Sequence, residues 1–361
     1  MHRDMRTNYR IERANGGLLC DLWFLTSGCR HDASGGCVMC NYGKNGGFID
    51  EKEILHELEH IVEKLSLNFE DFLLTSSGSL LDVREVSLDM REKLIPILET
   101  VQTKRFIIET RSDTITDSGI DFLKRIVPDS EKYIEIGVES SDDWVLKYCI
   151  NKEAAFQKFQ EAVEKLHSNG IYVIANIGVG FPFMSEKASV RHSIQSIRDV
   201  LEAGADSVVL FPYHVKRGTL LDVMYQQGMY QPISLWAFVE VLNSFSEDDL
   251  QKLQISWYKD YFGEEKSYIY RSPGTCPDCR EKVMKELDRY RNEQDPAIVK
   301  MLAEFPCGCK KEWRERLAEQ EEMIEIEVIE NMYRKLAGLY KLDQSVLEWE
   351  LCKMHQEYEQ R

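Results

Sequence analysis

The chain has 361 residues, of which 43% are apolar and 30% are charged, and its formal net charge is −17. This length allows one large domain of roughly 250 residues with an extension. The negative charge disfavours unaided binding to a nucleic-acid backbone, and no run approaches the ~18 apolar residues of a membrane span. The N-terminal stretch MHRDMRTNYRIER has no apolar core, so we expect no signal peptide and a cytoplasmic protein. Ten cysteines in such a protein are expected to be ligands or buried thiols rather than disulfides.

Short apolar runs alternate with amphipathic stretches through the first two thirds of the chain. Strands are predicted at residues 17–26, 71–75, 105–110, 133–140, 171–180 and 206–213, and helices at 50–65, 86–101, 116–127, 151–170 and 185–204. Strands that alternate with helices indicate a parallel sheet whose outer face is covered by those helices. The predicted fold is therefore α/β: a partial (β/α)6 TIM-like barrel with a C-terminal extension. In such barrels the active site lies at the carboxyl ends of the strands.

The pattern changes after residue 248, so we predict a barrel domain at 1–248 and a mostly helical extension at 249–361. The extension holds a C-x2-C pair and a C-x-C pair, formed by Cys276, Cys279, Cys307 and Cys309. Four thiols can close a tetrahedron around structural zinc. An auxiliary [4Fe-4S] cluster and the binding of a soft ligand are the alternatives. The other cysteines outside the first loop, Cys20, Cys149 and Cys352, are expected to be ordinary thiols.

A loop after the first predicted strand carries three cysteines, Cys29, Cys37 and Cys40, with the spacing C-x7-C-x2-C. Structural zinc takes four protein ligands, and a fourth is hard to find, since His31 follows Cys29 too closely to join without strain. Three thiolates instead suit a [4Fe-4S] cluster in which one iron stays open to a small molecule. Zinc completed by His31 or by a distant residue, and unliganded thiols, are the alternatives.

This cysteine loop, placed after the first strand of a six-unit barrel, resembles the radical S-adenosylmethionine superfamily. The usual spacing there is C-x3-C-x2-C, so the first gap here is four residues longer, while Met39 before Cys40 fits the pattern and is a candidate cofactor contact. The resemblance implies that the open iron binds the amino and carboxylate groups of S-adenosylmethionine. An electron from ferredoxin or flavodoxin then cleaves the sulfonium, and the resulting 5′-deoxyadenosyl radical abstracts hydrogen from a substrate.

Polar residues also follow the second and fourth predicted strands. In the superfamily, the position of Ser77, Gly78 and Ser79 binds the methionine amino group, so these residues are candidates for that role. Glu139 is a candidate for hydrogen bonds to the ribose hydroxyls. An ordinary strand-helix turn and a surface carboxylate are the alternatives.

The third and fifth predicted strands end in further candidates for cofactor binding. Glu109 and Arg111 end the third strand, where an arginine can clamp the carboxylate of methionine or of a substrate; a structural ion pair is the alternative. Asn176 and Gly178 end the fifth strand, where a glycine lets the backbone approach a ligand such as adenine closely.

The segment after the sixth strand is the one basic and aromatic cluster on the predicted active face. It contains Tyr213, His214, Lys216 and Arg217, and we take it as the candidate substrate pocket. Tyr213 and His214 are the candidate catalytic residues beside the cysteines. A lone histidine is more often structural, so His214 by itself is weak evidence.

Several phrases resemble one branch of the superfamily, the radical subunits of archaeosine synthase. They are SSGSLLDVREV, ETRSDTIT, IGVESSDDWVLKYCINK and VKRGTLLDVMYQQGMYQPISLWAFVEVL, and together with the cysteine loop they cover most of residues 20–245. That branch cleaves a carbon–nitrogen bond of a lysine-modified deazaguanine in tRNA. Because a charge of −17 opposes tRNA binding, a smaller modified nucleoside or another small molecule stays open as the substrate.

Two functions of other kinds stay open beside this one. The cluster could transfer the 3-amino-3-carboxypropyl group of S-adenosylmethionine to sulfur or arsenic of a small molecule, with methylthioadenosine as the second product. Alternatively, the cysteines could hold zinc in an interaction protein that has no catalytic activity, which would be colourless and free of iron after anaerobic purification.

Overall fold

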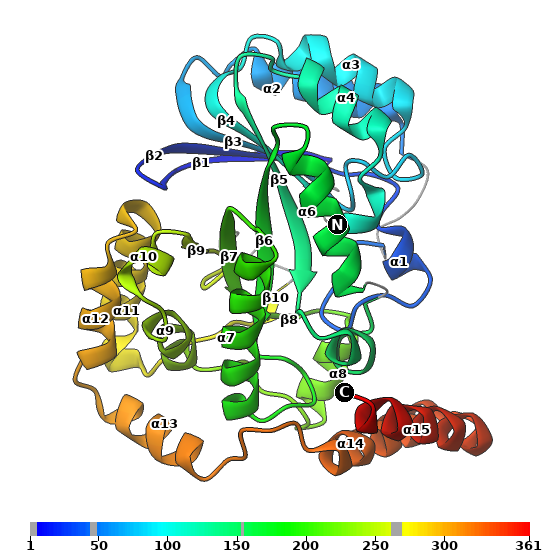
Figure 1. The fold of residues 1–361 in the computed structure, drawn as a ribbon, viewed down its shortest axis with the longest axis vertical. Helices are drawn as coiled ribbons and strands as arrows, with labels where there is room; N and C mark the ends of the chain where they lie inside the picture. The colour runs from blue at the N-terminus through cyan, green and yellow to red at the C-terminus, as the bar shows by residue number, and fades with distance from the viewer. Residues whose placement is uncertain (1–5, 44–48, 153–154, 261–268) are drawn as a thin grey trace.

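The computed structural model describes residues 6–43, 49–152, 155–260 and 269–361. Eight strands form one curled sheet in the order β1-β2-β3-β4-β5-β6-β7-β9 (Figure 1). They are β1 Thr7–Ala14, β2 Gly17–Phe24, β3 Asn68–Ser76, β4 Gln102–Thr110, β5 Glu131–Glu139, β6 Tyr172–Val179, β7 Ser207–Pro212 and β9 Leu253–Ile255. Neighbours from β2 onward are parallel. The six predicted strands correspond to β2–β7, and the partial barrel is confirmed.

The sheet has one more strand at each edge than the sequence predicted. Strand β1 is antiparallel to β2 and pairs with it through a tight turn, with Ala14 opposite Gly17. Asn15 and Gly16 in this turn have φ of 52° and 79°, as the preferred two-residue hairpin turn requires. At the other edge, β9 pairs with β7 and lies beyond the boundary expected at residue 248.

Five helices connect the strands and cover the outer face of the sheet. They are α2 Glu51–Val62, α3 Leu88–Leu98, α4 Asp117–Arg125, α6 Phe156–His167 and α7 Glu186–Glu202. Every second strand residue, such as Leu22, Phe72 and Phe106, points outward and is buried against them in the main core. Serine caps start α3 and α7, because Ser87 and Ser185 accept hydrogen bonds from backbone N–H groups of the first turn.

The fourth predicted helix, expected at residues 151–170, begins later than expected. Residues 146–150 form a π-helical turn that ends at Asn151, whose φ is 57°. A left-handed residue ends a helix, so the segment from Asn151 onward cannot continue it. Helix α6 therefore starts at Phe156, and residues 153–154 lie outside the described part of the chain.

Smaller elements complete the barrel region. They are α1 Arg30–Ala33, the 3₁₀ turn η1 Ser112–Thr114, α5 Asp143–Val145, η2 Leu146–Ile150, β8 Val215–Lys216, α8 Leu220–Gln226, α9 Leu235–Asn243, α10 Glu247–Leu250 and β10 Ile269–Arg271. Strands β8 and β10 pair with each other in a separate two-stranded sheet. None of the helices in the described ranges is long and apolar enough to cross a membrane.

The extension is helical, as predicted, and packs on two sides of the barrel (Figure 1). Its helices are α11 Pro277–Glu293, α12 Pro296–Glu304, α13 Gly308–Ala318, α14 Ile326–Tyr340 and α15 Gln344–Glu359. Helix α11 reaches both sheet edges: the Asn15 amide donates to the Arg291 carbonyl at 3.0 Å, and the Tyr290 hydroxyl donates to the Leu253 carbonyl at 2.8 Å. Helices α14 and α15 contact the segment after β5, where Tyr333 donates to the Tyr148 carbonyl at 2.6 Å.

Candidate active site at the carboxyl edge of the sheet

The cysteine loop leaves the sheet at the carboxyl end of β2 and is tied to the neighbouring end of β3. The Thr26 amide donates to the Ser77 hydroxyl at 2.8 Å, and the Ser77 amide donates to the Phe24 carbonyl at 3.1 Å. Cys29 follows this tied segment and is the residue immediately before α1, a helix of a single turn. The first cysteine is therefore fixed by the edge of the parallel sheet, where active sites of such folds lie.

The second half of the loop is held from the opposite side. The Val38 amide donates to the Ile150 carbonyl at 2.8 Å, and the Leu221 amide donates to the Val38 carbonyl at 3.0 Å. Val38 and Met39 are buried in a second apolar cluster with residues of η2, α8, α14 and α15. Cys37 packs against this cluster, so the helical extension supports the loop that carries the second and third thiols.

The three thiols of the loop interact electrostatically with one another and with two lysines. Burial raises the pKa of Cys37, the positive charge of Lys152 opposes the rise, and the neighbouring thiols add to it. Burial likewise raises the pKa of Cys40, and Lys216 opposes this rise. All three cysteines are partly accessible. Thiolates at these positions would therefore have two cations beside them, which stabilises the charged form.

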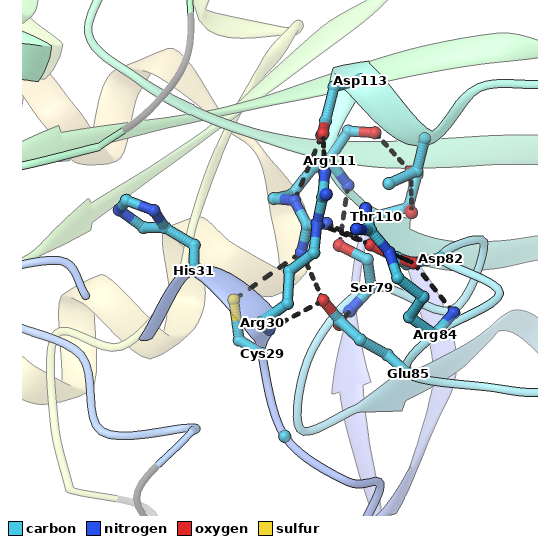
Figure 2. A network of polar contacts seen from close by, with 12 residues as sticks. Cys29, Arg30, His31, Ser79, Asp82, Arg84, Glu85, Thr110, Arg111 and Asp113 are labelled. Carbon is cyan, nitrogen blue, oxygen red and sulfur yellow. Dashed lines mark hydrogen bonds and ion pairs between the residues drawn. The ribbon is translucent and has the colours of Figure 1, made fainter. Parts of the chain in front are cut away.

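The three cysteines of the loop and the four cysteines of the extension differ in how closely their thiols approach one another. In the described ranges, the four cysteines of the extension are the one group of three or more possible metal ligands whose donor atoms all lie within 4.8 Å of each other. The donors for a single ion must approach in this way. A cubane cluster instead attaches each thiolate to a different iron atom, and Cys29, Cys37 and Cys40 do not form a group of that tightness in the described ranges. The ring of His31 bonds the Asn151 carbonyl at 2.7 Å and points away from the ion-pair network in Figure 2.

A buried carboxylate, Glu85, organises the loop after β3 (Figure 2). Its oxygens accept hydrogen bonds from the Arg30 amide at 3.0 Å and from the Ser79 amide at 2.5 Å. A Cβ atom added to Gly78 would lie 2.2 Å from the Glu85 carboxylate, so this close approach requires glycine. No described residue donates a hydrogen bond to the Gly78 carbonyl, which leaves that oxygen as an acceptor beside Cys29.

Arg111 joins this network and reaches the first thiol. Its guanidinium donates to Glu85 at 2.7 Å and to Asp82 at 2.6 Å, and it lies 3.6 Å from the sulfur of Cys29. Although burial alone lowers its pKa, the hydrogen bond and charge of Glu85 raise it above the usual range. The carboxylates of Asp82 and Glu85 thus occupy the Arg111 guanidinium, which the sequence assigned to a carboxylate of methionine or of a substrate. The observed geometry is that of the ion pair left open as the alternative.

The end of β5 is bent to bring a second carboxylate to the site. The β5–β6 register shifts between Gly137 and Glu139, and Glu139 has a φ of 68°, which is uncommon for a residue with a Cβ. The Glu139 carboxylate contacts the Lys152 ammonium at 3.1 Å and accepts a hydrogen bond from the Tyr213 hydroxyl at 3.2 Å. Strained backbone of this kind collects at functional sites.

The ends of β6 and β7 hold the remaining candidates. A Cβ on Gly178 would lie 2.2 Å from the Tyr213 hydroxyl, so glycine here accommodates that ring. Asn176 faces the interior of the barrel, and its side-chain oxygen has no hydrogen-bond partner among the described residues. His214 bonds the Ser272 hydroxyl at 3.0 Å and the Trp257 carbonyl. Burial lowers the pKa of His214 to about 4, so it is a neutral ring held between protein groups.

The interior of the barrel below the cysteine loop is acidic. Burial raises the pKa of Glu135 to about 7, and a hydrogen bond from Asn176 opposes that rise. Burial and the nearby charge of Glu135 raise the pKa of Glu109 well above its usual range. Burial also raises the pKa of Asp21. These carboxyl groups are buried and raise one another's pKa through their charges, so part of the set is protonated near neutral pH.

Sequence reasoning missed several residues of this site. Lys152 and Glu85 both lie inside phrases that carried the family resemblance, but nothing in their spacing assigns them a role. The signal for Asp21 and Glu135 was available, because an ionisable residue that alternates with buried apolar residues in an interior strand must face the barrel lumen.

Comparison with known proteins identifies the family. Residues 23–208 match the Radical SAM superfamily, and the chain therefore belongs to it. The family implies a [4Fe-4S] cluster and S-adenosylmethionine as cofactors, and the resemblance drawn from the cysteine loop is confirmed.

Two curated relatives share a name. The chain is 27% identical over 299 residues to archaeosine synthase subunit beta of Methanosarcina acetivorans, with 81% of this chain and 83% of that protein covered. It is 30% identical over 223 residues to archaeosine synthase subunit beta of Thermococcus kodakarensis, with 60% and 68% covered. Among solved structures, archaeal Methanocaldococcus infernus Elp3 with an N-terminal deletion gives a TM-score of 0.48 at 18% identity, covering 66% of this chain and 59% of that one.

Proposed function

We propose that this radical SAM enzyme holds its cluster through Cys29, Cys37 and Cys40 and acts on a lysine-modified deazaguanine nucleoside by cleaving a carbon–nitrogen bond. The observation that carries the first part is the placement of three partly accessible thiols on the loop that leaves the carboxyl edge of the sheet after β2. The similarity to archaeosine synthase subunit beta supports the second part. Ferredoxin or flavodoxin is the proposed electron donor.

When bound, the cluster supplies the electron that cleaves S-adenosylmethionine. The residues of this chain bind and orient that molecule. The unshared Gly78 carbonyl is the acceptor proposed for its amino group, and Lys152 and Lys216 attract its carboxylate. Glu139 and Asn176 are proposed to contact the ribose and the adenine. The apolar cluster beneath the loop keeps water from this side of the site.

The barrel interior supports a substrate that carries a positive charge. Its carboxyl groups on β2, β4 and β5 have raised pKa values, so a bound cation would favour their charged form, and they would release protons as they become its carboxylate partners. The lysine portion of the proposed substrate has an ammonium group that could enter this space. The net charge of −17 opposes a tRNA backbone, so we propose that the nucleoside is the part bound inside the barrel.

The test begins with the cofactor reaction. Anaerobic protein with dithionite and S-adenosylmethionine should form 5′-deoxyadenosine, and Cys37→Ala should form none. Cys352→Ser is the matched control, because Cys352 is an exposed thiol on α15, and it should retain full activity. Methylthioadenosine as the main product would instead assign the chain to 3-amino-3-carboxypropyl transfer.

The substrate is tested by isotope transfer. A lysine-modified deazaguanine nucleoside, deuterated on its lysine carbons, should pass deuterium to 5′-deoxyadenosine and yield the amidine-bearing product. The same base within tRNA is the second arm of the experiment. If neither form accelerated 5′-deoxyadenosine release or transferred deuterium, the substrate assignment would be wrong while the cofactor reaction stood.

A further inference from the structure

The extension gathers the thiols of Cys276, Cys279, Cys307 and Cys309 at one point. The sulfur atoms of Cys276 and Cys279 are 3.5 Å apart, and those of Cys307 and Cys309 are 3.4 Å apart. Between the two pairs, Cys276 and Cys307 are separated by 3.6 Å, as are Cys279 and Cys309. All four sulfurs lie within 4.8 Å of one another.

We infer that this quartet binds a single zinc ion as a closed structural site and not an auxiliary iron–sulfur cluster. A tetrahedral ion with metal–sulfur bonds of ~2.3 Å has sulfur–sulfur edges of about 3.8 Å, close to the observed values. In a cubane the four thiolates sit outside a core of four irons and four sulfides, each on its own iron. Sulfurs 3.4–3.6 Å apart leave no room for that core.

The surroundings compensate the charge that such a site carries. Four thiolates around Zn²⁺ have a net charge of −2, and two helix N-termini meet there, since Cys276 and Cys307 are the N-caps of α11 and α13. Positive helix ends stabilise thiolates. The Trp236 indole N–H also donates to the Cys309 sulfur at 3.2 Å. This is the outer hydrogen bonding that orients metal ligands.

The position of the quartet shows which helices the zinc ion would hold together. It links the beginnings of α11 and α13, and Trp236 connects it to α9 of the barrel region. Cys276 and Cys309 line a cavity of about 620 Å³ that is also lined by Gly180 and Phe181, the residues after β6. With four protein ligands the ion has no open position, so it fixes this wall of the cavity and takes no part in chemistry.

The test is a metal analysis of protein in which the first cluster cannot form. Cys29→Ser/Cys37→Ser/Cys40→Ser should retain one zinc per chain and lose its iron and acid-labile sulfide. X-ray absorption at the zinc edge should show four sulfur neighbours at ~2.3 Å. Iron with sulfide remaining in this variant, or zinc bound through nitrogen or oxygen, would overturn the inference.

A second measurement covers the case in which that variant does not fold. Wild-type protein reconstituted anaerobically should contain about four irons and one zinc. A content near eight irons without zinc would contradict the inference. Cys279→Ser/Cys309→Ser should lose the zinc but keep the iron and the formation of 5′-deoxyadenosine, whereas Cys352→Ser should keep both metals.

Discussion

The two cysteine sets of this chain are arranged differently, as their two proposed roles require. The three thiols at the barrel mouth are spread over one loop, are partly accessible, and lie near Lys152 and Lys216. The four thiols of the extension touch one another and are held at two helix N-termini. An open site needs a free coordination position and charged neighbours for a ligand, whereas a closed site needs only its own four ligands. The difference predicts that changes at the mouth alter chemistry, and changes at the quartet alter stability.

The largest effect on activity is expected at the three cysteines of the loop at the carboxyl edge of the sheet. Cys29→Ala removes one of the three proposed cluster ligands, so 5′-deoxyadenosine formation should fall by at least about a thousandfold, equivalent to ~4 kcal/mol. Thermal unfolding should change little, because Cys29 lies on a partly accessible loop. Chromatographic assay of 5′-deoxyadenosine and a melting curve of the same sample check both parts. Equal loss of stability and activity would remove the distinction between the two sets.

The quartet should show the opposite pattern. Cys307→Ser opens the proposed zinc tetrahedron and should lower the free energy of unfolding by roughly 3–5 kcal/mol, because metal binding is coupled to folding. Turnover per iron measured well below the melting temperature should stay near that of the wild type. Denaturant titration gives the free energy of unfolding, and an activity assay at low temperature gives the turnover. An unchanged unfolding midpoint would argue against a structural metal.

A substitution at Glu85 tests how far the stability and cofactor binding of the site around the cysteine loop depend on a buried charge. Glu85→Gln leaves Arg111 without its main partner in a site where the Glu85 side chain is 1% exposed. Breaking a buried pair on one side typically costs about 3 kcal/mol. The variant should also bind S-adenosylmethionine more weakly, since Glu85 orders the Gly78 turn. Glu92→Gln breaks an exposed pair with Arg125 and should change neither the unfolding midpoint nor the affinity.

Burial of the carboxyl groups inside the barrel should lower the stability of the folded protein at high pH. The folded pKa of Glu135 is about 7, above the ~4.3 of a free glutamate, so wild-type stability falls as the pH rises through this window. Glu135→Gln should be more stable than the wild type by on the order of 2 kcal/mol at pH 8. Denaturant titrations from pH 4 to pH 8 should show this gap closing at the acid end; a gap independent of pH would contradict the buried-charge explanation.

The smallest effect is expected at the quartet's outer hydrogen bond. Trp236→Phe keeps most of the ring packing against Phe305 but removes the donor to the Cys309 sulfur. We expect a loss of about 1 kcal/mol of stability and faster release of zinc to a chelator. The zinc content before chelation should be unchanged, and a release rate equal to that of the wild type would show that the bond contributes nothing.

The sequence predicted the barrel because its apolar runs are regular, and each of the six strands was placed within a few residues. Strand β1 was missed since Arg10 and Glu12 make it read as a polar terminus, although the Asn15-Gly16 pair is a hairpin signal. The three residues of β9 are too few to be recognised without their partner strand. Lys152 could not be assigned, because it reaches the site only through the π-helical turn that precedes it.

The cysteines could be singled out as candidate ligands because their chemistry is carried by residue type and spacing. The residues that surround these cysteines in the fold could not be predicted. Arg111 looked free to bind a ligand, and its occupants, Asp82 and Glu85, come from a loop on the preceding strand-helix unit. The residue pattern of the quartet leaves zinc and an iron–sulfur cluster both open, and only the sulfur–sulfur distances favour zinc.

The most direct measurement of the central claim is the paramagnetic resonance signal of reduced, anaerobic protein before and after addition of S-adenosylmethionine. The account predicts a cluster signal that S-adenosylmethionine alters in the wild type and equally in Cys279→Ser/Cys309→Ser, and that is absent in Cys37→Ala. A signal that responds to S-adenosylmethionine in Cys37→Ala, or one that vanishes with the quartet, would contradict the assignment of the open cluster to the loop.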